Sequence, residues 1–88
     1  MYLDIYSAEI SKKLVRLKRK DPVQHEALKK KIIQILENPL HQYKELRHNL
    51  KGKCRIHIGH FVLIFIIDHQ KKTIFFEDYD HHDNIYES

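Results

Sequence analysis

The N-terminal part of the chain changes from an alternating pattern of hydrophobic residues to a helical one. Residues 2–6 alternate weakly between apolar and polar positions, which predicts a short strand. Ser7 follows and is a favourable N-cap residue. Ile10, Leu14 and Leu17 then recur at helical spacing with basic residues between them. The pattern predicts a basic amphipathic helix directly after the first strand.

A second helix is predicted from Asp21 to Asn38. Asp21 can cap it, Pro22 suits the first helical position, and Gln24 occupies the position of a capping-box partner. Pro39 ends the segment, because the residue before a proline avoids helical backbone angles. The apolar stripe of this helix is formed by Leu28, Ile32, Ile35 and Leu36.

The second half of the chain has the features of strands. After a linker at 40–52, strands are predicted at 53–58, at about 61–68 and at about 72–78, separated by short polar turns. The middle run, "FVLIFII", is apolar at every position and is therefore expected to be the central strand, covered on both faces. The tail "YDHHDNIYES" follows the last strand.

This order, β-α-α-β-β-β, predicts an α+β fold in which an N-terminal strand and a helical hairpin pack on a small, mainly antiparallel sheet. Eighty-eight residues are enough for a single domain, 1–88.

The only cysteine is Cys54, so no disulfide framework is possible, and a cytoplasmic protein is expected. The segment "MYLDIYS" lacks the features of a signal peptide, and 61–67 is too short to span a bilayer.

Charge is distributed unevenly along the chain. Residues 1–55 contain 14 Lys/Arg and 6 Asp/Glu, a net charge of +8, whereas residues 56–88 contain 2 and 6, a net charge of −4. A basic segment of this length favours an anionic partner, either nucleic acid or an acidic protein. Six of the eight histidines lie from His48 onward, on or near the predicted strands.

The stretch "KCRIHIG" contains the most distinctive pattern. Because successive side chains of a strand point to opposite faces, Cys54, Ile56 and Ile58 are expected to face the helices. The opposite, open face then carries a row of cationic and titratable side chains: Lys53, Arg55 and His57. The linker and the tail are expected to add further candidates to this face: Lys44, Arg47, His48, Lys51, His81, His82 and Tyr86.

The residue types on this open face allow three interpretations. Charged residues on a strand are most often simply solvated. A metal site could use "HHD" or "HIGH", but the spacing lacks the Cys/His pairing of structural zinc sites, so no metal and no cofactor are predicted. Phosphate chemistry fits the residue types better, because cations neutralise a phosphate and histidines exchange protons near neutral pH.

The chain resembles the RelE/ParE superfamily, the small toxins of toxin–antitoxin pairs, over nearly all of its length. The resemblance rests on the element order, on "KGKCRIHIGHFVLIFII" and on the terminal "YDHHDNIY". It implies a RelE-like toxin fold, an acidic RelB-like antitoxin as partner, and no membrane association. In the RelE branch it also implies cleavage of messenger RNA on the ribosome without a metal, which inhibits translation.

The resemblance assigns roles to individual residues. Arg55 and His57 match the two basic positions of their strand, and Tyr86 matches a tyrosine that stacks on a base. In the YafQ-like branch, His48, His57 and His82 match catalytic histidines. His81 is the alternative to His82, and the expected RNA contacts are completed by Arg47, Lys51 and Lys53.

Two departures from the family pattern affect the expected function. Val62 stands where many RelE-like toxins have arginine, and Asp80 and Asp83 make the tail acidic. The main hypothesis is a metal-independent endoribonuclease. The alternatives are a non-enzymatic ParE-like poison of DNA gyrase, which has no chemical need for the histidines, and an antitoxin-binding relic with weakened or lost cleavage.

Overall fold

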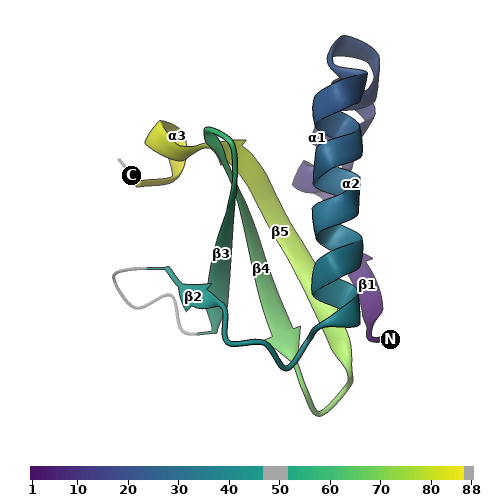
Figure 1. Cartoon of the computed structure of the whole chain (residues 1–88), viewed down its shortest axis with the longest axis vertical. Helices are drawn as coiled ribbons and strands as arrows, with labels where there is room; N and C mark the ends of the chain where they lie inside the picture. The colour runs from purple at the N-terminus through teal and green to yellow at the C-terminus, as the bar shows by residue number, and fades with distance from the viewer. Residues whose placement is uncertain (47–51, 87–88) are drawn as a thin grey trace.

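A computed structural model describes residues 1–46 and 52–86 of the chain. Two long helices cover one face of a five-stranded mixed sheet, and a third, short helix lies on the other side of the strands (Figure 1). This is the α+β fold that the sequence predicts. The elements in chain order are β1 (Leu3–Tyr6), α1 (Ala8–Lys20), α2 (Pro22–Glu37), β2 (Lys44–Glu45), β3 (Lys53–Ile58), β4 (Phe61–Asp68), β5 (Thr73–His81) and α3 (His82–Tyr86).

The helix starts are capped at the predicted residues. The Ser7 hydroxyl accepts a hydrogen bond from the Ile10 backbone N–H at 3.0 Å, and the Asp21 carboxylate accepts one from the Gln24 N–H at 3.1 Å. The capping box is only half formed, because the Gln24 side chain donates to the hydroxyl of Tyr79 at 2.7 Å. Gln24 therefore joins α2 to β5 instead of closing its own cap.

The sheet has the strand order β1-β5-β4-β3-β2. β1 runs parallel to β5, and the other pairs are antiparallel. β3 and β4 have the predicted bounds, whereas β5 extends to His81, three residues beyond the expected end. β2 was not expected; it consists of two linker residues, Lys44 and Glu45, which pair with Arg55 and Cys54.

The two faces of the sheet are covered differently. On the helix face, Leu63, Phe65 and Phe76 are completely buried in the main core, together with Ile10 and Leu28 from the helices. Ile58 belongs to the same core, and Cys54 and Ile56 pack against it, as the alternation in β3 predicts. Cys54 itself is only partly buried.

The opposite face of β4 is also apolar and buried. Val62 is 0% exposed and Ile64 2% exposed, although neither belongs to the helix-side core. Their neighbours in register are His57 and Asp80 for Val62, and Arg55 and Asp78 for Ile64. The polar side chains of β3 and β5 thus flank an apolar central strip. Within the described residues, no helix has the length and apolar character needed to cross a membrane.

Candidate active site

Strand β3 brings two of the predicted site residues together on the open face. The guanidinium of Arg55 lies with Nη1 3.5 Å from Nε2 of His57, and its Nε donates to the backbone oxygen of Glu45 in β2 at 3.2 Å. The side chain of His57 is exposed. The pairing of β2 with β3 therefore positions an arginine beside an accessible imidazole.

Lys53, the third residue of this row, is engaged with an acid. Its ammonium lies 2.8 Å from Oε1 of Glu77, across β4. Glu77 reaches this position because the register between β4 and β5 shifts at Ile64/Phe65, which leaves Glu77 without a direct cross-strand partner. Both side chains are about a quarter to a third exposed, so this ion pair is weak, and Lys53 can exchange Glu77 for another anionic partner.

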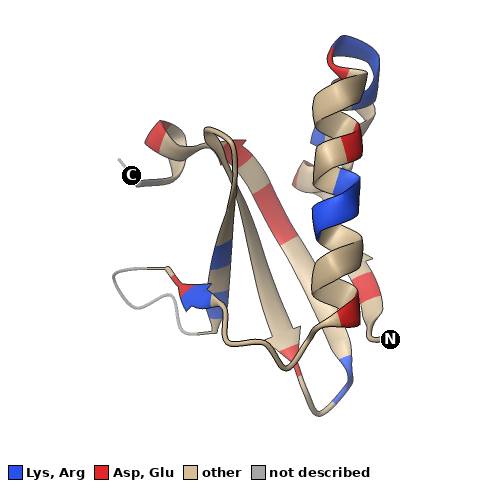
Figure 2. Cartoon of the chain, viewed as in Figure 1, with Lys and Arg blue, Asp and Glu red and all other residues tan. Residues whose placement is uncertain are grey.

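The strand on the far side of β4 carries acids instead of cations. Figure 2 shows acidic residues along β5 and basic residues on β2 and β3. The cross-strand register places Asp80 opposite Val62 and Val62 opposite His57. Neighbouring strands lie about 4.8 Å apart, so the backbones that carry the cations and the acids are separated by about 10 Å.

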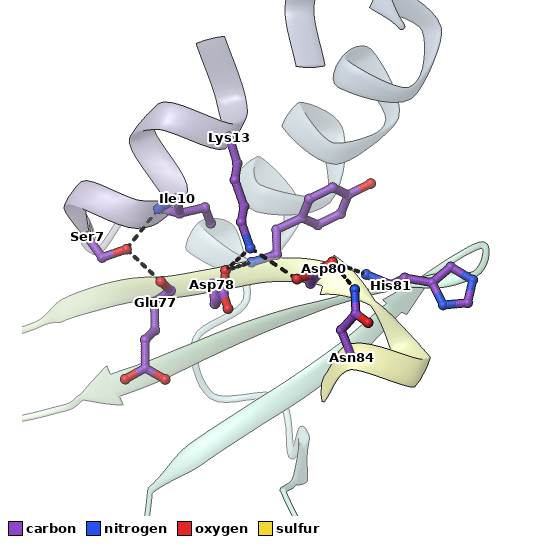
Figure 3. Close-up of polar contacts among 9 residues, drawn as sticks. Ser7, Ile10, Lys13, Glu77, Asp78, Asp80, His81 and Asn84 are labelled. Carbon is purple, nitrogen blue, oxygen red and sulfur yellow. Dashed lines mark hydrogen bonds and ion pairs between the residues drawn. The ribbon is translucent and has the colours of Figure 1, made fainter. Parts of the chain in front are cut away.

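Lys13 of α1 compensates the charge of these acids. Its ammonium lies 2.8 Å from Oδ1 of Asp78 and 3.3 Å from Oδ2 of Asp80 (Figure 3). Burial raises the pKa of Asp80, but hydrogen bonds from Asn84, the His81 N–H and Lys13 outweigh it, and the net effect is a lowered pKa. Lys13 therefore binds both Asp78 and Asp80 within the protein, and the lowered pKa keeps Asp80 ionised at neutral pH.

A cluster of histidines lies where β5 ends and meets the β3–β4 turn. The rings of His81 and His82 stack with centroids 4.6 Å apart, and His60 in the turn lies 6.2 Å and 6.4 Å from them. The His82 backbone N–H donates to the oxygen of His60 at 3.0 Å, which ties the tail to the turn. Asp83 completes the cluster, with Oδ1 2.9 Å from Nδ1 of His82.

The predicted site residues thus fall into two groups: Arg55 and His57 on β3, and His81 and His82 at the end of the sheet. His57 is two residues from the turn that contains His60, so both groups lie towards the same end of the sheet. Their catalytic roles stay predictions. Four further predictions concern Arg47, His48, Lys51 and the side chain of Tyr86, which lie outside the described residues.

A hollow of about 390 Å³ lies beside Arg55 and His57 and was not predicted. Its other walls come from Ile56 and the segment 41–44, in which His41 and Tyr43 meet edge to face with ring centroids 4.8 Å apart. This segment was predicted to be a linker, because only the pairing of Lys44 and Glu45 with β3 brings it to the site. The aromatic residues of the segment are the one feature of the sequence that could have indicated a role at the site.

Comparison with known proteins identifies the family. The family model described as "ParE toxin of type II toxin-antitoxin system, parDE" matches residues 5–86. A Methanocaldococcus jannaschii protein named "Putative toxin RelE4" is 46% identical over 78 residues, which are 88% of this chain and 82% of that protein. The chain belongs to the RelE/ParE toxin superfamily. It is a toxin of a type II toxin–antitoxin system.

Two further matches cover almost the whole chain. An uncharacterised Methanosarcina mazei protein is 42% identical over 87 residues, 98% of the toxin and all of its relative. A chain of the intact E. coli RelBE toxin–antitoxin complex is 22% identical, with a TM-score of 0.77, over 92% of the toxin and 96% of that chain. At this identity, the structural likeness shows the RelE-like fold.

Proposed function

We propose that this toxin is an endoribonuclease that cleaves messenger RNA on the ribosome and thereby inhibits translation. The observation that carries the proposal is the Arg55 guanidinium beside the exposed imidazole of His57, with Nη1 and Nε2 3.5 Å apart. An arginine can hold two phosphate oxygens at once, and an imidazole can exchange protons near neutral pH. A phosphodiester bound to Arg55 therefore lies within reach of a proton acceptor.

The reaction that these groups support is an internal transfer. The 2′-hydroxyl of the RNA attacks the adjacent phosphorus, the bond from phosphorus to the 5′-oxygen breaks, and a 2′,3′-cyclic phosphate and a 5′-hydroxyl are formed. Neutral His57 accepts the proton of the 2′-hydroxyl, and protonated His82 donates a proton to the leaving 5′-oxygen. Arg55 stabilises the charge that develops on the phosphoryl oxygens.

His81 is the second candidate for the general acid. Its backbone pairs with Phe61, whose ring packs against the helix-side core, and its own ring meets that of Phe61 edge to face at 5.6 Å. His82 starts α3, on the side of the strands away from α1 and α2. This placement favours His82 as the acid and His81 as the ring that positions it.

The hollow next to Arg55 offers space for a nucleotide that flanks the cleaved bond. His41 and Tyr43 supply aromatic surface there, and Lys44 supplies positive charge. Base–aromatic stacking is worth about 1–3 kcal/mol per base and tolerates any sequence. Arg47, Lys51, Lys53 and Tyr86 are proposed to make further contacts with the RNA, and His48 is proposed to take part in catalysis.

The partner that silences the toxin is an acidic antitoxin. The net charge of +8 over residues 1–55 favours an acidic protein. The structural relative from E. coli was solved as a toxin–antitoxin complex. Exposed apolar side chains on β1, α1 and α2, namely Leu3, Ile5, Val15 and Ile33, offer contact area for such a partner.

Single substitutions test the cleavage mechanism on programmed ribosomes. Arg55→Ala, His57→Ala and the double change of His81 and His82 to alanine should each lower the cleavage rate by about 10²–10⁴-fold, because each removes a proton transfer or a charge contact. His25→Ala is the matched control, since it removes a histidine from α2, remote from the open face. Retained antitoxin binding shows that each variant is folded. Unchanged cleavage by His57→Ala and by the double variant would refute general acid–base catalysis.

The acids on β5 favour a second candidate, a toxin that binds its target without cleaving RNA. Asp78 and Asp80 lie across the sheet from Arg55 and His57 and make this half of the open face unfavourable for phosphate. The match to the ParE family model agrees with this candidate. In that case the His57→Ala variant would arrest growth as the unmodified toxin does, and message from arrested cells would be uncut.

A further inference from the structure

We propose that His60, His81, His82 and Asp83 form a binding site for a divalent transition-metal ion such as Zn²⁺. His81, His82 and Asp83 each place one possible ligand atom within 4.8 Å of the others. The groups come from two consecutive elements, since His81 ends β5 and His82 and Asp83 begin α3. His82 cannot bind the ion and serve as the protonated acid of the proposed cleavage at the same time, so metal binding would oppose that reaction, and the site is tested by binding alone.

The distances in the cluster are compatible with one shared ion. Zn²⁺ binds imidazole nitrogens and carboxylate oxygens at about 2.0–2.2 Å, so tetrahedral ligands lie roughly 3.4 Å apart. Asp83 Oδ1 is already 2.9 Å from Nδ1 of His82, and Oδ2 is 3.5 Å from Nδ1 of His81. The side chains are 39%, 41% and 57% exposed for His81, His82 and Asp83, so small rotations suffice to close the cluster.

His60 is the fourth ligand of the proposed site. Its ring centroid lies 6.2 Å from that of His81 and 6.4 Å from that of His82. Its backbone oxygen accepts the hydrogen bond from the His82 N–H, so the turn already stands next to the tail. Its side chain is exposed and can rotate towards the other two rings. An ion held by all four residues would link the β3–β4 turn to the C-terminal tail.

The donor set selects the class of metal. Three imidazoles and one carboxylate suit zinc, copper or nickel, whereas magnesium and calcium require oxygen ligands. The Asp83 backbone N–H donates to Nδ1 of His81 at 3.2 Å, which holds this ring beside the start of α3. Metal ions bind the neutral form of imidazole, so protons compete with the ion at low pH.

Isothermal titration of the purified full-length toxin with ZnCl₂ tests the site. We expect one Zn²⁺ per chain with micromolar affinity at pH 7.5, and at least tenfold weaker binding at pH 5.5. MgCl₂ at tenfold excess should not compete. His82→Ala, Asp83→Asn and His60→Ala should each weaken binding by at least tenfold.

Two matched variants control for adventitious binding to surface histidines. His25→Ala and His69→Ala each remove one histidine remote from the cluster and should bind zinc as the unmodified toxin does. In NMR spectra, zinc should shift the ring signals of His60, His81 and His82 and leave those of His25 unchanged. Equal zinc affinity in all five variants, or ring shifts spread over all histidines, would overturn the proposal. Unchanged affinity in His60→Ala alone would overturn the four-ligand set.

Discussion

Cys54 and His57 stand on opposite faces of the same strand, and Cys54 is the less accessible of the two. Cys54 packs against the helix-side core, and burial raises the pKa of its thiol, with the charge of Glu45 adding to the effect. His57 is exposed on the open face. The thiolate is the reactive form, so both burial and the raised pKa slow the reaction of Cys54.

We therefore expect a thiol reagent at pH 8 to label Cys54 at least tenfold more slowly in the folded toxin than in urea. The matched control is a cysteine moved to the other face by combining Cys54→Ala with His57→Cys, and it should react at nearly the unfolded rate. The rates can be followed by absorbance. Fast labelling of native Cys54 would mean that the two faces of β3 are reversed, and with them the placement of Arg55.

At the scale of elements, α1 is attached to the edge of β5 beyond the end of β1. Ser7 donates its hydroxyl hydrogen to the backbone oxygen of Glu77, and Lys13 bridges Asp78 and Asp80. Desolvation alone would lower the pKa of Lys13. The hydrogen bonds and charges of Asp78 and Asp80 outweigh desolvation, and the net result is a raised pKa. One lysine therefore keeps two neighbouring acids of a strand in close proximity.

Lys13→Ala should lower the free energy of unfolding by about 0.5–1 kcal/mol at pH 7, a modest value because the groups are partly exposed. The folded pKa of Asp80 is lowered, so its contribution is present above the unfolded value of 3.8 and is lost as the pH falls below it. The difference from the unmodified toxin should thus shrink as the pH is lowered below 3.8 in urea titrations. Lys12→Ala, at an exposed neighbouring position, is the control. A difference that persists at pH 2 would contradict the ion-pair explanation.

Local pattern predicts some elements of this toxin and not others. β3 and β4 were predicted with their observed bounds, because a strict alternation and an apolar run of strand length are both local signals. β2 has no such signal, since Lys44 and Glu45 are charged and extended only through pairing with Arg55 and Cys54. β5 extends into the polar tail because Phe61 and Val62 provide it with a partner.

The contacts of the candidate site also divide into those that local spacing predicts and those that it does not. The placement of Arg55 beside His57 follows from their spacing of two on one strand. The contact of Lys13 with Asp78 joins residues 65 positions apart, and the approach of His60 to His82 depends on how β4 and β5 pair. Such contacts depend on the sheet topology, which cannot be predicted from the spacing of residue types along the chain.

At the scale of the whole molecule, the separation of charge along the chain determines how a partner approaches. Residues 1–55 carry a net charge of +8 on a toxin whose total is +4. A long-range attraction of this kind raises the association rate by about 10–10³-fold at low ionic strength and is screened by salt.

The association rate of the toxin with the proposed acidic antitoxin should therefore fall at least tenfold between 50 and 500 mM NaCl. Stopped-flow fluorescence measures this rate. Changing Lys18, Arg19 and Lys20 to glutamine, at the end of α1, should reduce the salt dependence. A rate independent of salt would show that the partner is recognised through apolar contacts instead.

The parallel pairing of β1 with β5 has a consequence for biosynthesis. Leu3 lies opposite Thr73, so β1 can pair with β5 only after β5 has been synthesised. Contacts between such distant parts of a chain form late and slowly. A nascent chain that stops short of β5 lacks the partner of β1, the anchor of Ser7 and the acids that hold Lys13. We therefore expect the complete fold to form only after β5 has been translated, and a chain terminated before residue 73 leaves β1 without its partner strand.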